Sequence, residues 1–113
     1  MNILVSWNAD TKESKGVYAG SPSMLSLVYP VADIIEAKYP QIFEKSYHSV
    51  GAGMVYFDDL TPDEFKIVYA LTCKQYERFI EDHPTEANRR WSGAKGENWE
   101  ELMKFMREDN RLK

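Results

Sequence analysis

The sequence predicts an α+β domain in which a small β-sheet of two to three short strands is packed by three main α-helices. Apolar residues alternate with polar ones near the N-terminus and form a short run at residues 54–57, which predicts strands. Residues 22–38, 62–82 and 99–109 carry apolar stripes at helical spacing, which predicts three helices. No linker or repeat divides the chain, so we expect residues 1–113 to form a single globular domain.

The first predicted strand covers residues 2–7. Ile3, Val5 and Trp7 occupy alternate positions and are therefore expected on one face of the sheet. Residues 9–16 are polar and turn-like, and residues 17–19 are expected to return as a short second strand. The two strands would then form a hairpin with a long loop. Residues 54–57 predict a third, buried strand.

The helix predicted near residues 22–38 begins with Ser21 as an N-cap and Pro22 at the first helical position. Pro30 lies inside its apolar stripe and removes one backbone donor, so we expect a kink or two abutting helices. The helix should end at Tyr39, because a residue that precedes proline avoids helical backbone angles.

The helix predicted at residues 62–82 has the strongest local signal. Thr61 and Glu64 have the spacing of a capping box, with Pro62 at the first helical position. Leu60 and Phe65 occupy the two positions of a hydrophobic staple, one before the cap and one in the first turn. These features place the beginning of the helix at residue 62.

Three other segments are less regular. Ile42 and Phe43 are expected core anchors, and residues 47–50 are compatible with a strand or a loop. Asn98 is the expected cap of the last helix, and residues 109–113 are expected to fray.

Composition excludes several classes of protein. A lone cysteine, Cys73, cannot form an intrachain disulfide and fits a reducing compartment, so we expect a cytoplasmic protein. The N-terminus lacks the basic region of a signal peptide, and no apolar stretch is long enough to cross a membrane. The net charge of −4 disfavours nucleic acid as a partner, because phosphate contacts need clustered lysine and arginine.

The negative charge is concentrated in one segment. Four of the 18 acidic residues fall within residues 58–64, and the 14 that remain equal the number of basic residues. Asp63 and Glu64 suit a first helical turn, where carboxylates interact favourably with the helix dipole. Asp58 and Asp59 precede the cap, so a structural role and a binding role explain them equally well. A magnesium site at the two aspartates is a weaker alternative, because the cluster lacks the alternating acid spacing and the glycine of an EF-hand loop.

The profile of a small, acidic, aromatic-rich domain without a catalytic set predicts a non-enzymatic protein-binding module. We expect an inhibitor or immunity-type protein that neutralises a basic protein, such as a toxin nuclease, by masking its active or substrate-binding surface. Acidic residues would steer association, and an aromatic residue such as Trp91 or Tyr18 would anchor it. The predicted partner-binding residues are Asp58, Asp59, Glu77, Glu81, Asp82 and Trp91. No catalytic residue, metal or cofactor is predicted, and a small-molecule ligand is left open.

Two other functions stay open at the level of sequence. A small hydrolase or ribonuclease would use His48 and His83, the residues that titrate near neutrality without a special environment. A structural subunit would instead self-associate through an apolar face. Cys73 is expected to be a small buried hydrophobic residue in the middle of a helix, because no histidine lies at helical spacing from it. Gly51 and Gly53 lack the third glycine of a dinucleotide-binding loop and are expected in a bend or bulge.

Overall fold

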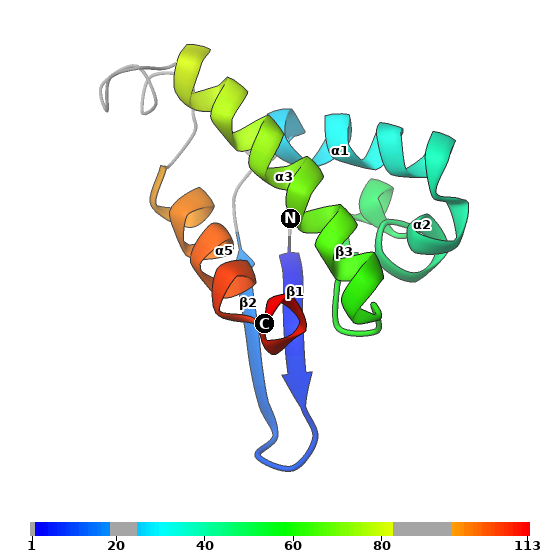
Figure 1. Cartoon of the computed structure of the whole chain (residues 1–113), viewed down its shortest axis with the longest axis vertical. Helices are drawn as coiled ribbons and strands as arrows, with labels where there is room; N and C mark the ends of the chain where they lie inside the picture. Colours follow the sequence, from blue (N-terminus) through cyan, green and yellow to red (C-terminus); the bar gives the residue numbers. More distant parts are fainter. Residues whose placement is uncertain (1, 19–24, 83–95) are drawn as a thin grey trace.

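A three-stranded sheet packed by helices forms the fold of this chain (Figure 1). The computed structural model describes residues 2–18, 25–82 and 96–113. The elements in chain order are β1 (Asn2–Asn8), β2 (Glu13–Tyr18), α1 (Leu25–Lys38), α2 (Pro40–Ser46), the 3₁₀ turn η1 (Val50–Ala52), β3 (Met54–Tyr56), α3 (Pro62–Asp82), α5 (Gly96–Glu108) and the 3₁₀ turn η2 (Asn110–Leu112). The predicted α+β class, with a small sheet and three main helices, is confirmed.

β1 is the central strand of the sheet, which has the order β2-β1-β3. It pairs antiparallel with β2 and parallel with β3. The prediction of a long hairpin loop is wrong, because Asn8 already pairs with Glu13 and only residues 9–12 form the turn. The Asn8 side chain closes this turn by accepting hydrogen bonds from the backbone N–H groups of Asp10 and Thr11, at 3.0 and 3.3 Å. Lys12 completes the turn with a left-handed φ of 56°.

A β-bulge interrupts the pairing of β1 with β2. Leu4 is opposite Gly16 and Ser6 is opposite Lys15, so Val5 is an extra residue in β1. An extra residue shifts the alternation of side chains on the strand that contains it. Odd-numbered residues of β1 therefore point to the inner face before the bulge, and even-numbered residues point there after it.

This change of phase corrects the predicted orientation of Trp7. Ile3 and Val5 are buried on the inner face, as expected. Beyond the bulge, the register places Ser6 and Asn8 on that inner face and turns Trp7 to the outer face. Trp7 is 52 % exposed, whereas Val5 is fully buried. The common face expected for Ile3, Val5 and Trp7 is wrong because of the bulge.

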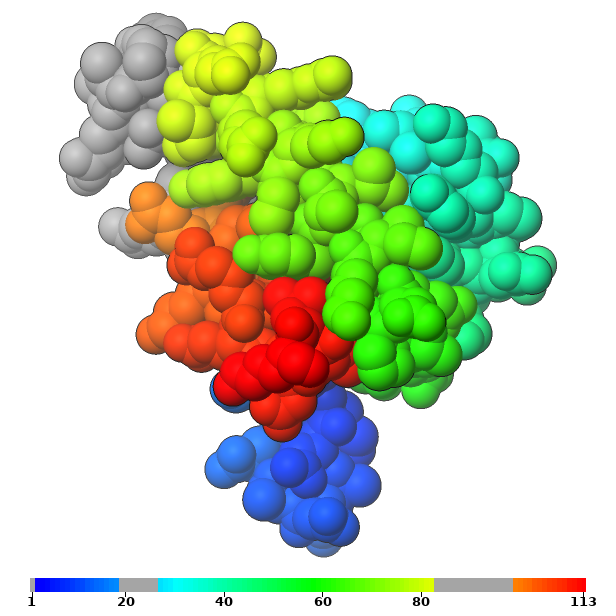
Figure 2. Space-filling view, in the orientation of Figure 1, coloured from blue at the N-terminus to red at the C-terminus, as the bar shows by residue number. Residues whose placement is uncertain are grey.

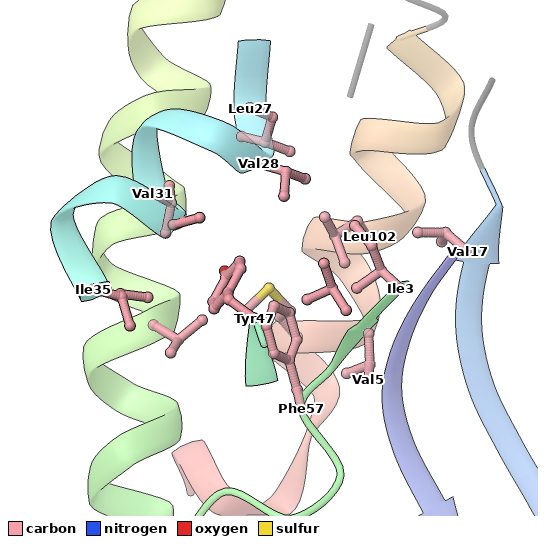
Figure 3. Packing of buried hydrophobic residues seen from close by; sticks show 14 of the residues in the cluster. Ile3, Val5, Val17, Leu27, Val28, Val31, Ile35, Tyr47, Phe57 and Leu102 are labelled. Atoms are coloured by element: carbon pink, nitrogen blue, oxygen red, sulfur yellow. The ribbon is translucent and has the colours of Figure 1, made fainter. Parts of the chain in front are cut away.

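The core lies between the inner face of the sheet and the helices α1, α3 and α5. Figure 3 shows one side of it, where residues of α1 face Tyr47, Phe57 and the sheet. Trp99 of α5 is fully buried and stacks on Phe79 of α3, with ring centroids 4.3 Å apart. The apolar stripe predicted within residues 99–109 faces the core, and its residues Trp99, Leu102, Met103 and Met106 are buried.

The capping box that begins α3 is confirmed. The backbone N–H of Thr61 donates to Glu64 Oε1 at 3.0 Å, and the backbone N–H of Glu64 donates to Thr61 Oγ1 at 3.2 Å. Lys45 of α2 lies 2.9 Å from the same carboxylate oxygen. The ion pair with Lys45 and the Thr61 hydrogen bonds hold the pKa of Glu64 below its ordinary value. Leu60 and Phe65, the expected staple, are both buried in the core.

In the middle of the chain, α1 runs through Pro30 as one helix, which excludes two abutting helices and leaves the alternative of a kink as a prediction. The chain after Tyr39 forms the short helix α2, which sequence reasoning missed although Pro40 occupies its favourable first position. Ile42 is buried and Phe43 packs against the core, as expected. The segment predicted as a strand or loop forms a turn at residues 47–49, followed by η1.

The C-terminal tail does not fray. Residues 110–112 form η2, and the Asp109 side chain accepts a hydrogen bond from the backbone N–H of Arg111 at 2.9 Å. The prediction was wrong because Arg111 binds the body of the molecule, as described below. α5 begins at Gly96, so Asn98 lies within the helix and is not its cap. The predicted cap at Ser21 lies outside the described residues, as does the segment at 83–95.

Candidate functional site

An open groove of about 500 Å³ lies between the β1–β2 hairpin and the C-terminal turn. Figure 2 shows the hairpin projecting from the body of the molecule, with the C-terminal turn beside its base. The groove is lined by Ser6, Trp7, Asn8, Ala9, Glu13 and Lys15 of the hairpin, by Asp58, and by Phe105, Glu108, Asp109, Asn110 and Arg111. It therefore combines three parts of the chain that are distant in sequence.

The bulge at Val5 determines which hairpin residues border the groove. Ser6 and Lys15 are opposite each other, as are Asn8 and Glu13, and the register places all four on the inner face. Without the extra residue in β1, Trp7 would take the place of Ser6 and Asn8 on the inner face. The bulge thus provides a polar and charged wall on the hairpin side of the groove.

Arg111 fixes the opposite wall. Its guanidinium donates to the backbone carbonyls of Val5 (2.8 Å), Leu60 (3.1 Å) and Phe57. The Arg111 side chain also makes a two-pronged ion pair with Asp109, with distances of 2.8 and 2.9 Å. One arginine therefore ties the C-terminal turn to β1 and to the loop between β3 and α3.

The surroundings of Arg111 are largely shielded from water. The side chains of Arg111 and Asp109 are 15 % and 8 % exposed, and the guanidinium carbon lies 4.0 Å from the centroid of the Phe65 ring. Burial opposes ionisation of Asp109, but the hydrogen bonds from Arg111 outweigh it and hold the pKa of Asp109 below its ordinary value. Asp109 and Arg111 thus neutralise each other within the wall of the groove.

The charge left in the groove is negative. Lys15 is the remaining basic residue of the lining, whereas Glu13, Asp58 and Glu108 are acidic. Glu13 and Glu108 are exposed and Asp58 is half-buried. None of the three acids forms an ion pair within the described ranges of the chain. Their carboxylates are thus accessible to a cationic group from outside.

The predicted partner-binding residues do not form one surface. Asp58 lines the groove, and Asp59 is its exposed neighbour in the turn before α3. Glu77, Glu81 and Asp82 are exposed near the other end of α3. At 1.5 Å per residue, the helix separates Pro62 from Glu77 by about 22 Å. Trp91, the predicted anchor, lies outside the described residues.

The candidates for catalysis and metal binding gain no support in the described part. His48 is exposed and stacks on Tyr56, with centroids 5.9 Å apart, while His83 lies outside the described residues. Cys73 is only half-buried. Burial and a hydrogen bond with Cys73 both raise the pKa of Tyr69. Across residues 2–18, 25–82 and 96–113, no group of three or more metal-ligating side chains comes together.

Sequence reasoning missed Trp7 and Arg111 as surface and groove residues. Trp7 looked like a core residue because its spacing matched Ile3 and Val5. Arg111 looked like part of a polar tail, and no local pattern marks a side chain that binds carbonyls more than 50 positions away. The only available signal was the spacing of Asp109 and Arg111, two positions apart and next to the apolar Leu112.

Comparisons with known proteins returned no family model, no curated protein and no solved structure that matches this chain. In the part of the chain that the structure describes, no helix has both the length and the apolar character that a membrane crossing requires.

Proposed function

We propose that this protein is a non-enzymatic protein-binding module of the inhibitor or immunity type, which neutralises a basic partner by covering its functional surface. The observation that carries the proposal is the acidic groove at the base of the hairpin, where Asp58, Glu13 and Glu108 are accessible and unpaired among the described residues. A lysine or arginine side chain of the partner would enter this groove. A nuclease is a suitable partner, because a site that holds phosphate attracts carboxylates as well.

The hairpin supplies the second part of the proposed binding surface. It projects from the body of the molecule, which leaves it open to contact by a partner (Figure 2). Trp7 and Tyr18 are 52 % and 69 % exposed on the outer face. Tryptophan and tyrosine are enriched among residues that dominate binding energy at protein interfaces. We therefore assign the anchoring role first given to Trp91 or Tyr18 to Trp7 and Tyr18.

Affinity capture with the full chain from its native host would identify the partner, and binding would then be measured against ionic strength. Because charge complementarity mainly accelerates association, Asp58→Lys and Glu108→Lys should slow association and reduce its salt dependence. Glu36→Lys is the matched control, because Glu36 is exposed on α1 and the change in net charge is the same.

Two results would overturn the proposal. Capture of acidic partners alone, or of none, contradicts a basic partner. Equal effects of Asp58→Lys and Glu36→Lys would mean that only net charge matters and that the groove is not the binding site. Trp7→Ala and Tyr18→Ala test the anchors separately, through faster dissociation with little change in association.

A further inference from the structure

Along the outer edge of β2, backbone groups have no hydrogen-bond partner among residues 2–18, 25–82 and 96–113. The N–H of Asn2 donates to the Gly53 carbonyl and the N–H of Phe57 donates to the Leu4 carbonyl, both at 2.8 Å. Residues 2 and 4 of β1 therefore point their backbone groups toward β3. Because these directions alternate along a strand, Ile3 points its groups toward β2.

The pairing of β1 with β2 fixes the direction of the backbone groups of β2 as well. Ile3 is opposite Val17, so Val17 turns its N–H and carbonyl toward β1. Alternation along β2 then turns the backbone groups of Ser14, Gly16 and Tyr18 to the free edge. These three residues are exposed, whereas Val17 is buried on the inner face. No hydrogen bond from the described residues outside the hairpin reaches them.

We propose that a second copy of this chain pairs antiparallel with this edge of β2, around a two-fold axis at Gly16. The two sheets would then form one continuous sheet. Ser14 would be opposite Tyr18 of the second copy, and Gly16 opposite Gly16. Two hydrogen bonds for each of the three pairs give about six bonds between the chains, which use every outward group of β2 on both copies.

Two-fold axes at the neighbouring residues would give less favourable pairing of the two β2 strands. An axis at Lys15 would put the two lysines directly opposite each other, and like charges in that position are destabilising. An axis at Ser14 would pair the edge with the turn at residues 9–12 instead of with strand. The axis at Gly16 places Lys15 opposite Val17 of the second copy. Charge and hydrogen bonding therefore select the same register.

The side chains of the outer face fit this register. Tyr18 would lie against the small Ser14 of the second copy, and Trp7 is the β1 neighbour of Ser14 in the same row. The two most exposed large aromatic residues of the described chain would thus come together across the new pairing. Gly16 itself cannot carry a side chain, because a Cβ there would lie 2.7 Å from the Ile3 carbonyl oxygen.

Sedimentation equilibrium over a wide concentration range tests the association. Wild-type protein should shift from monomer to dimer as concentration rises. Ser14→Pro should remain monomeric, because proline removes an outward N–H while the hairpin keeps its own hydrogen bonds. Ser14→Thr is the matched control and should dimerise like the wild type. Circular dichroism and thermal unfolding establish that both variants fold.

Cysteine cross-linking tests the register in a Cys73→Ser background. Chains with Ser14→Cys mixed with chains with Tyr18→Cys should form a mixed disulfide dimer, because opposite residues have Cα atoms within disulfide range. Neither variant should cross-link alone, since the two copies of residue 14 would be offset by four positions, or about 13 Å.

Each outcome decides the proposal. Efficient cross-linking of Ser14→Cys alone would overturn the Gly16 axis. A wild-type chain that stays monomeric at millimolar concentration would overturn the pairing itself. This inference shares Trp7 and Tyr18 with the proposed function but does not involve the groove, because Ser14→Pro leaves Asp58 and Glu108 unchanged. Loss of the dimer with retained partner binding would separate the two.

Discussion

The guanidinium of Arg111 donates a hydrogen bond of 2.8 Å to the backbone carbonyl of Val5, 106 positions earlier in the chain. Val5 is the extra residue of the β-bulge, and a bulge disrupts the regular ladder at the residue it inserts. The last turn of the chain thus satisfies a carbonyl at the irregular point of the first strand. The bulge and the C-terminal turn, which form the two walls of the groove, are therefore one structural unit.

Arg111→Met should lower the free energy of unfolding by about 2–3 kcal/mol. The substitution leaves the partly buried carboxylate of Asp109 without its partner, and an unsatisfied buried polar group costs about 1–3 kcal/mol, or more when it is charged. The carbonyls of Val5, Phe57 and Leu60 also lose their donor. Urea unfolding followed by fluorescence measures the change. Arg107→Met is the control, because Arg107 is exposed on α5 and should change stability by about 0.5 kcal/mol at most.

Asp109 should contribute a stability that depends on pH. Its pKa is lowered in the folded state, so the contribution is present above the ordinary pKa of aspartate, about 3.9, and is lost as the pH falls through the lower folded value. The difference in unfolding free energy between wild type and Asp109→Asn should therefore shrink as the pH falls below about 4. Glu64 is shifted in the same direction but is present in both proteins, so it cancels. A difference that stays constant from pH 7 to pH 2 would contradict this account.

Thr61→Ala should destabilise the protein by about 1 kcal/mol, the usual cost of removing an N-cap side chain. The hydroxyl of Thr61 accepts from the Glu64 N–H at 3.2 Å, and alanine leaves that donor without its partner. Thr61→Ser keeps the oxygen and should be close to wild type in thermal unfolding. An equal loss in both variants would place the contribution in the methyl group and not in the cap.

The contrast between Thr61 and Arg111 explains how far sequence reasoning reached. Cap, staple and apolar stripe of α3 lie within a few residues of each other, so a local pattern was sufficient to place the helix at residue 62. Arg111 contacts Val5, Phe57 and Leu60, and no local pattern encodes partners so distant. Asp58 was found from the concentration of acidic residues, but its place in a groove depends on the hairpin. The strands of the hairpin are longer than predicted, because the Asn8 side chain closes a short turn at residues 9–12. The polar residues of this segment are equally typical of a long loop, so their composition did not reveal the strand.

The bulge makes opposite predictions for Val5 and Trp7, two residues that a regular strand would place on the same face. Val5 is fully buried, so Val5→Ala should cost about 1–3 kcal/mol through lost burial and a small cavity. Trp7 is 52 % exposed, so Trp7→Ala should cost about 1 kcal/mol or less, although tryptophan is by far the larger side chain. Urea unfolding of both variants makes the comparison, with Leu102→Ala as the reference for a buried residue. If Trp7→Ala destabilises the fold as much as Leu102→Ala, then the strand keeps its regular alternation and the bulge at Val5 is absent in solution. The inner face of the hairpin would then carry Trp7 instead of Ser6 and Asn8.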